Sequence, residues 1–119
     1  MGFNDEFRKR TKSFALRIIK LFRSLPGNDD ARIIGKQLLR AGCSVGANFR
    51  AATRSRSKKE FNSKLSIVVE EADETCYWLE LLIEAGIIAE SKLRDLYTEA
   101  VEITKIVSVS RKTAKINRI

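Results

Sequence analysis

The sequence predicts an all-α protein that folds as an antiparallel, up-down-up-down four-helix bundle. Its 119 residues include one proline and six glycines, a composition typical of helices rather than of a sandwich or barrel. Apolar residues recur every three or four positions in four segments, and short turn signals separate those segments. Helices joined by short connections pack antiparallel to their neighbours, and a chain of this length can bury its own core. We therefore expect one domain that covers residues 1–119.

The first helix is expected over about residues 5–25. Asn4 and Asp5 suit its N-terminal cap, and residues 26–28 (Pro-Gly-Asn) form a strong stop signal. Its apolar stripe consists of Phe7, Phe14, Ile18, Leu21 and Leu25. The remaining arc is basic and consists of Arg8, Lys9, Arg10, Lys12, Arg17, Lys20 and Arg23. This arc is either an ordinary solvated face or a face for an anionic partner.

The second helix is expected over about residues 30–53. Its core-facing residues are Ile34, Leu38, Ala41, Val45, Phe49 and Ala52, with Asn48 as a polar exception that should be hydrogen-bonded. Gly35, Gly42 and Gly46 line one edge of this helix. An interior glycine costs about 1 kcal/mol relative to alanine. Three of them on one edge predict the close approach of another helix, in the same chain or in a neighbouring subunit.

The third helix is expected over residues 58–84. Residues 57–60 (Ser-Lys-Lys-Glu) match the capping box, in which side chains satisfy two free amides at the helix start. The apolar stripe is Phe61, Leu65, Val68, Ala72, Thr75, Leu79 and Leu82. A second apolar row, Ile67, Trp78 and Leu81, lies away from this stripe and predicts contact with another subunit. The predicted oligomer interface consists of this row together with Gly42 and Gly46.

The fourth helix is expected over about residues 92–112, after Gly86 ends the third helix and Ser91 provides a cap. Its stripe is Leu93, Leu96, Ala100, Ile103 and Val107. Beyond Ser110 the stripe fails, because Arg111, Lys115 and Arg118 take its positions. The pattern predicts that residues 111–119 form a basic, partly frayed tail that extends past the bundle.

The charge distribution favours a polyanionic partner. The formal net charge is +8, and residues 32–59 contain eight basic residues and no Asp or Glu. These eight candidate nucleic-acid-binding residues are Arg32, Lys36, Arg40, Arg50, Arg54, Arg56, Lys58 and Lys59. The row from Arg32 to Arg54 shares one helix side over about 33 Å, about one duplex turn. Such a row binds phosphates with little sequence specificity. Alternatively, it pairs with the acidic third helix of a neighbouring copy.

The chain lacks the residues that most enzymes need. Because histidine is absent, Ser-His and Cys-His nucleophiles and His-based zinc sites are excluded. Phosphate-binding loops, dinucleotide-binding glycine motifs and C-x-x-C pairs are also absent. The acidic cluster Glu70, Glu71, Asp73 and Glu74 could share a helix face, but di-iron bundles need Glu-x-x-His pairs. We therefore expect a protein that is not an enzyme and uses neither a metal nor another cofactor.

The sequence also predicts a cytoplasmic protein that does not bind membranes. The N-terminal residues are polar and charged, and no apolar run approaches the ~20 residues that span a bilayer. Cys43 and Cys76 fall inside expected helices and should be reduced and buried. A membrane-surface helix would carry bulky apolar residues beside its basic face, whereas this one carries Cys43 and Ala47.

Several motifs resemble the signature of a known family. They are residues 35–50 (GKQLLRAGCSVGANFR), 57–61 (SKKEF), 64–66 (KLS) and 71–82 (E-x-x-E-x-x-YWLELL). Together they resemble the bacterial four-helix-bundle family of 23S rRNA intervening-sequence proteins, over roughly residues 5–110. Where that family usually has Glu-Ala after the Asn-Phe-Arg motif, this chain has Ala51 and Ala52.

The resemblance implies a four-helix bundle that assembles as a homopentameric ring. A related branch, the accessory variability protein of diversity-generating retroelements, is a basic pentamer that binds nucleic acid and works with a reverse transcriptase. The implied partners are therefore RNA or DNA, further copies of the chain, and a reverse transcriptase or a ribosomal component. The family has no catalytic residues to transfer. A binding role for Lys36, Arg40 and Arg50 follows from their placement and from analogy with that branch.

Overall fold

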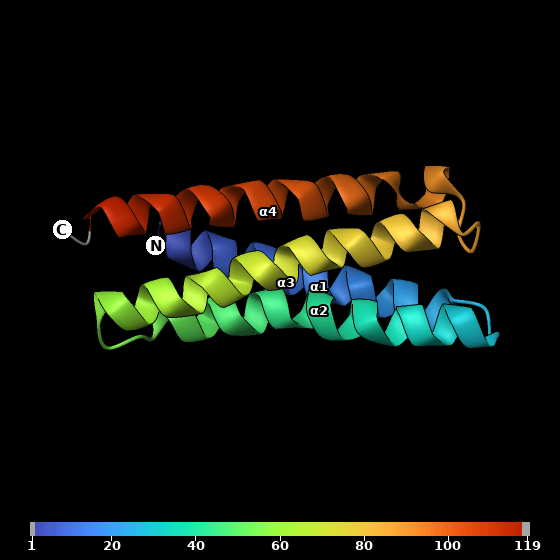
Figure 1. The fold of residues 1–119 in the computed structure, drawn as a ribbon, viewed down its shortest axis with the longest axis horizontal. Helices are drawn as coiled ribbons and strands as arrows, with labels where there is room; N and C mark the ends of the chain where they lie inside the picture. The colour runs from blue at the N-terminus through green and yellow to red at the C-terminus, as the bar shows by residue number, and fades with distance from the viewer. Residues whose placement is uncertain (1, 118–119) are drawn as a thin grey trace.

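The computed structural model describes the backbone of residues 2–117 and the side chains of residues 2–114, and it contains four helices. They are α1 (Phe3–Ser24), α2 (Asp29–Thr53), α3 (Lys58–Glu84) and α4 (Glu90–Asn117). No strand occurs in residues 2–117. Figure 1 shows the four helices side by side in a rod of 49 × 23 × 19 Å. The predicted fold class, an antiparallel four-helix bundle, is confirmed.

The helices pack in chain order around the bundle. α2 lies along both α1 and α3, α3 also lies along α4, and α1 meets α4 more sparsely. This order makes α2 and α3 the central pair, each with two long helix contacts. Consequently the basic second helix has two different neighbours, and each of its sides experiences a different environment.

Local capping chemistry explains where the helices begin and end. Ser57 Oγ accepts a hydrogen bond from the Glu60 amide at 3.1 Å, as the capping box predicts for its first bond. Gly86 adopts φ +71°, and the Ile87 amide reaches back to the Leu82 carbonyl at 3.0 Å, which closes α3 as a Schellman motif. α1 begins at Phe3 rather than near Asp5, because the Glu6 amide bonds the Gly2 carbonyl.

The core is continuous along the rod and follows the four predicted stripes. The largest fully buried side chains include Phe14, Phe49, Ile18, Leu38 and Leu79. Burial of one such side chain contributes about 1.5–3 kcal/mol. The buried hydroxyls in this core bond backbone carbonyls of their own helices: Thr11 bonds Phe7 at 2.9 Å and Thr75 bonds Glu71 at 2.7 Å. The side-chain nitrogen of Asn48 likewise donates to the backbone carbonyl of Ser44, at 2.9 Å.

The helix that approaches the glycine edge of α2 is α1 of the same chain. A Cβ at Gly42 would lie 2.9 Å from a side-chain carbon of Ile18, and a Cβ at Gly46 would lie 3.4 Å from the Thr11 backbone. Gly42 is buried under Ile18. The glycines therefore let α1 and α2 approach each other, so Gly42 cannot contact a neighbouring subunit while α1 is in place.

The fourth helix extends further than its stripe predicts. It starts at Glu90, ahead of Ser91, and continues to Asn117. Ala114 still packs against the core, seven residues after the buried Val107, so the bundle does not end at Ser110. The side chains of Lys115 and Arg118, which the tail prediction also used, lie outside the described residues. Within residues 2–117 none of the helices combines the length and apolarity that crossing a bilayer requires.

Candidate nucleic-acid interface

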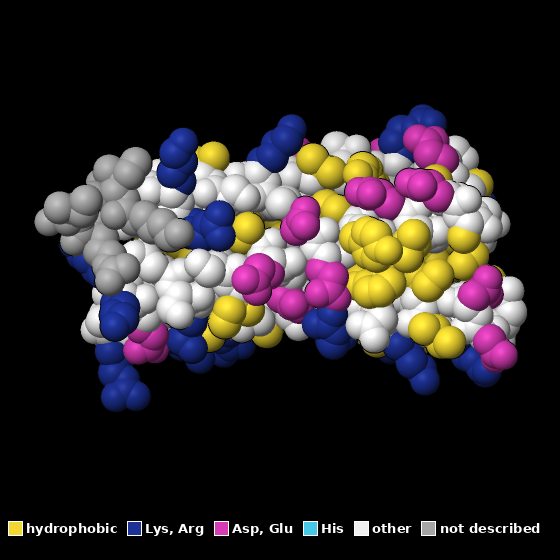
Figure 2. Space-filling view, viewed as in Figure 1, with side chains coloured by type: hydrophobic (Ala, Val, Ile, Leu, Met, Phe, Trp, Pro, Cys, Tyr) yellow, Lys and Arg dark blue, Asp and Glu magenta, His cyan; other side chains and the backbone are white. Residues whose placement is uncertain are grey.

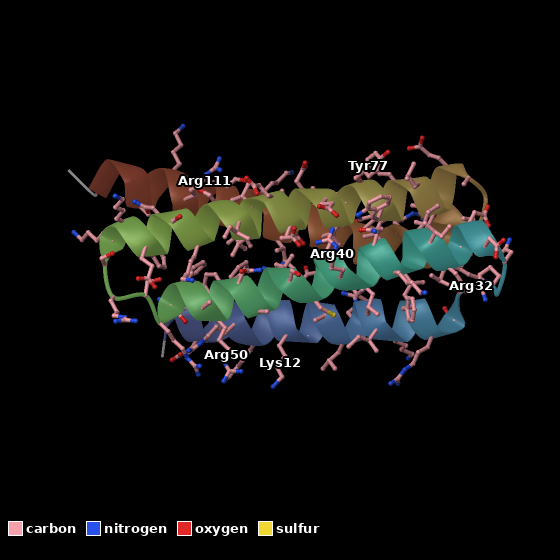
Figure 3. The ribbon with its side chains drawn as sticks, turned by 60° about the horizontal axis from the view of Figure 1, so that its bottom comes forward. Lys12, Arg32, Arg40, Arg50, Tyr77 and Arg111 are labelled. Atoms are coloured by element: carbon pink, nitrogen blue, oxygen red, sulfur yellow. The ribbon has the colours of Figure 1, made fainter. Side chains whose placement is uncertain are left out.

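The basic row of α2 is divided between two neighbouring helices. Arg40 points toward α3, where its Nη1 atom lies 3.0 Å from Glu71 Oε2 and its Nη2 atom pairs with Glu74. Arg50, in contrast, points to the side occupied by α1, as does Lys12 of α1 (Figure 3). Arg54, the C-cap residue of α2, lines the same groove as Arg50, four residues before it. The row predicted as one surface therefore contributes to two.

A groove between α1 and α2 gathers the basic side chains on the α1 side. It has a volume of about 430 Å³, and we call it the basic groove. Its lining residues are Arg8, Lys9, Lys12 and Ala15 from α1, Cys43, Gly46, Ala47 and Arg50 from α2, and Arg54 at the C-cap of α2. All its charged lining residues are cations, and they come from both walls. The small side chains on α2 leave room between the helices.

The electrostatics of the basic groove favour an anion. Lys9, Lys12, Arg50 and Arg54 are exposed, whereas Arg8 also pairs with Asp5 within α1. Burial raises the pKa of the Cys43 thiol, so this group stays protonated and neutral at physiological pH. The groove therefore presents cations above a floor of small, uncharged groups.

The other predicted binding residues lie at the two ends of α2. Arg32 pairs with Asp29 at 2.9 Å, and both line a shallow depression with Lys36. Arg56 and Lys58 line a second depression at the corner between α2 and α3. Lys59 is exposed in the first turn of α3. Arg54 of the basic groove lies in the chain between Thr53 and Ser55, which both line the corner depression.

The acidic cluster of α3 contacts α2. Glu71 and Glu74 both bind Arg40, and the Trp78 indole nitrogen donates to Glu74 Oε2 at 2.9 Å. Glu70 and Asp73 are exposed. The described part of the chain contains no cluster of three or more acidic or cysteine side chains arranged to hold a metal ion.

Comparison with known proteins identifies the family. The family model of the 23S rRNA-intervening sequence proteins matches residues 4–109. The chain belongs to this family. Among solved structures it is similar to a protein of unknown function from the S23 ribosomal protein family of Bacteroides thetaiotaomicron, with 35% identity and a TM-score of 0.85. That similarity covers 92% of this chain and 97% of the other. Among curated proteins no match is found.

In this member of the 23S rRNA-intervening sequence family, the outer face of α3 is partly apolar. Figure 2 shows hydrophobic side chains gathered over the second half of α3, with acidic side chains around them. Of the predicted interface residues, Trp78 and Leu81 lie in this second half and are half-buried, whereas Ile67 lies in the first half of α3 and is 42% exposed. Tyr77, which is 52% exposed and stacks edge-on against Trp78, extends this surface. Because Tyr77 lies four residues before Leu81, helical spacing could have placed it on this surface from the sequence alone.

Two further polar contacts join helices of this family member. The Arg10 guanidinium donates to both carboxylate oxygens of Glu99, at 2.8 and 2.7 Å, which links α1 to α4 and lowers the pKa of Glu99. The Tyr97 hydroxyl donates to Glu80 at 2.7 Å, and this bond to a carboxylate raises the pKa of Tyr97 to about 12. Both contacts join residues of different helices. The spacing of residues within one helix therefore cannot predict them.

Proposed function

We propose that the protein is a non-enzymatic nucleic-acid-binding protein that contacts RNA or DNA phosphates through the basic groove. The observation that supports this is the groove itself, which holds four cations on α1 and α2, a fifth at the C-cap of α2, and no acidic lining residue. Cations that neutralise phosphates release counterions, and this gives affinity without sequence specificity. The family description names 23S rRNA, so an rRNA hairpin is the first ligand to test.

The proposed binding site differs from the predicted one, because its groove combines residues of α1 and α2, whereas the predicted basic row lies on α2 alone. Lys9 and Lys12 join Arg50 and Arg54, whereas Arg40 is excluded because two carboxylates already neutralise it. Arg56, Lys58 and Lys59 extend the cationic surface at the corner of α2 and α3. Binding therefore depends on two helices that the glycine edge holds close together.

We also propose that the protein acts as a homo-oligomer, with a pentamer as the expected form. The support is the partly apolar outer face of α3, where Ile67 and Tyr77 are exposed. An alternative within the same assembly is a structural role, in which the basic groove pairs with acidic residues of a neighbouring copy. Exposed Glu70 and Asp73 on α3 favour this alternative.

The double variant Arg50→Glu/Arg54→Glu tests the proposed function. Fluorescence anisotropy with a labelled RNA hairpin should show that the wild type binds at low salt. At moderate salt, the affinity of the variant for the hairpin should be lower than that of the wild type by about tenfold or more. The matched control is Lys92→Glu/Lys105→Glu, which changes the net charge equally but alters exposed residues of α4. The proposal fails if the wild type does not bind, or if both variants lose the same affinity.

Light scattering on the same proteins separates the two roles. Under the leading proposal, the Arg50→Glu/Arg54→Glu variant keeps the mass of the wild-type oligomer and loses only its affinity for nucleic acid. Under the structural alternative, it dissociates toward the 13.5 kDa monomer. A wild type that is monomeric at every concentration would contradict the proposed assembly.

A further inference from the structure

We infer that the ligand of the basic groove is the backbone of a single nucleic-acid strand, held in the groove without contact to its bases. This inference rests on the proposed function and makes it more specific. It follows from three features of the groove: its two cationic walls, its narrow, small-residue floor, and its non-aromatic lining.

The first feature is the arrangement of charge on both walls. Lys9 and Lys12 lie on the α1 wall, and Arg50 and Arg54 lie on the α2 wall. A strand between these walls can contact cations on both of its sides. A duplex placed on the same surface would lie above the groove and would leave its floor empty.

The second feature is the width of the groove. Packed helices have axes about 8–10 Å apart, so a crevice between them is too narrow to admit a duplex, whose major groove alone is ~12 Å wide. Here the glycine edge brings α1 and α2 together at Gly46. The space above Ala15, Cys43 and Ala47 therefore suits one chain of sugars and phosphates rather than two paired strands.

The third feature is the lining, which contains no aromatic side chain. Single-strand-binding proteins usually combine a cationic groove with aromatic platforms, on which the bases stack. With no platform in the basic groove, the bases point away and affinity depends on phosphates. We expect binding that is insensitive to base composition.

The path of the strand continues beyond the groove. From Cys43 to Arg54 the α2 wall is about 16 Å long at 1.5 Å per residue. The corner depression, whose residues Thr53 and Ser55 flank Arg54 in the chain, offers Arg56 and Lys58. The Ser55 hydroxyl oxygen is buried and has no hydrogen-bond partner in the described part of the chain.

The first experiment compares single strands with a duplex on the intact protein. Oligo(dT), oligo(dA) and a DNA duplex of equal length are titrated by anisotropy over a range of salt concentrations. We expect both single strands to bind equally and several-fold more tightly than the duplex. The logarithm of their affinity should fall with log salt at a slope of about −3.5, for five phosphate contacts. If the duplex binds as tightly as the strands or more tightly, the inference is overturned and the proposed function stands.

The second experiment locates the strand. Cys43 lines the groove, whereas Cys76 is only 7% exposed, so alkylation followed by mass spectrometry reports on Cys43. Oligo(dT) should slow alkylation of Cys43 several-fold. If the strand binds while Cys43 reacts at an unchanged rate, the inference is overturned. If neither strands nor duplex bind at low salt, the inference and the proposed function both fail.

The variant pair Ala47→Glu and Ala47→Gln tests the role of charge in the groove. Ala47 is exposed on α2, so both side chains fit without disturbing the core. They are similar in size, and glutamate adds only a negative charge. Glutamate should weaken oligo(dT) binding about fivefold or more relative to glutamine. Equal affinities for the two variants would overturn the inference.

Discussion

Arg40 and Arg50 belong to the same basic row of α2, but they lie in opposite environments. Arg40 faces α3 and binds Glu71 and Glu74, whereas Arg50 faces α1 and shares the basic groove with Lys12. At the contact between α2 and α3, the positive charge of Arg40 is thus neutralised. The contact between α1 and α2 concentrates cations above small residues. The comparison teaches that a charge on a helix acquires its role from the neighbouring helix rather than from its own row.

The two contacts also differ in how closely the helices approach. Between α1 and α2, Gly42 lies against the fully buried Ile18, and a Cβ there would be 2.9 Å from it. Between α2 and α3, long charged side chains reach across the outer edge. The close approach of α1 and α2 therefore depends on the missing side chain at Gly42. The contact between α2 and α3 is instead stabilised by ion pairs. Variants at each contact can test this difference.

The largest effect is expected for Gly42→Val at the contact of α1 and α2. The added side chain meets Ile18, which is β-branched and therefore stiff. Overpacking of this kind costs about 1–3 kcal/mol in stability, and we expect a value near the upper end. Urea denaturation followed by circular dichroism measures the loss.

Ile18→Ala provides the control for this prediction. In its background the clash is removed, so Gly42→Val should destabilise by at least about 1 kcal/mol less than in the wild type. A double-mutant cycle without such coupling would contradict close packing of Gly42 against Ile18. Nucleic-acid binding by Gly42→Val should weaken in parallel, since the groove depends on the same contact.

A smaller effect is expected for Arg40→Ala at the contact of α2 and α3. The arginine side chain is 47% exposed, so solvent screens the pair, but Glu71 is only 15% exposed. We expect a loss of about 1 kcal/mol that shrinks at high salt, with unchanged affinity for nucleic acid. Arg32→Ala is the matched control, because its partner Asp29 is 89% exposed. Equal losses in the two variants would contradict a structural role for Arg40.

The smallest effect is expected for Tyr97, which links α4 to α3. Its pKa in the folded chain is about 12, above the usual value of about 10, because its hydroxyl donates to Glu80. A raised folded pKa means that this stabilisation is complete below pH 10 and is lost as the pH rises toward 12. The stability difference between wild type and Tyr97→Phe should therefore narrow over that range in urea titrations. A difference that stays constant from pH 9 to 12 would refute the assignment.

Much of the fold could be predicted because it depends on local patterns. The stripe that includes Leu38, Val45 and Phe49 identifies the buried side of α2, and Ser57 and Gly86 mark the two ends of α3. These signals act within one or two helical turns. The apolar stripe places the end of α4 too early, because Arg111 interrupts the stripe although Ala114 still packs on the core.

The candidate site could be predicted only in part, because it combines two helices. The basic character of α2 was evident, but nothing in its spacing assigned Arg40 to α3 and Arg50 to α1. The contribution of Lys9 and Lys12 was likewise one of two open interpretations of the basic arc of α1. Which of these cations share a groove depends on how the helices are rotated against each other.

The sequence by itself determined four amphipathic helices, the two caps of α3, the absence of histidine chemistry and a strongly basic second helix. These properties follow from periodicity and composition, which act locally. Only the tertiary structure decided that the glycine edge meets α1, that Arg40 is neutralised by α3, and that five cations surround one groove. The physical reason is that the charge a ligand encounters is the sum over neighbouring helices, and packing alone selects those neighbours.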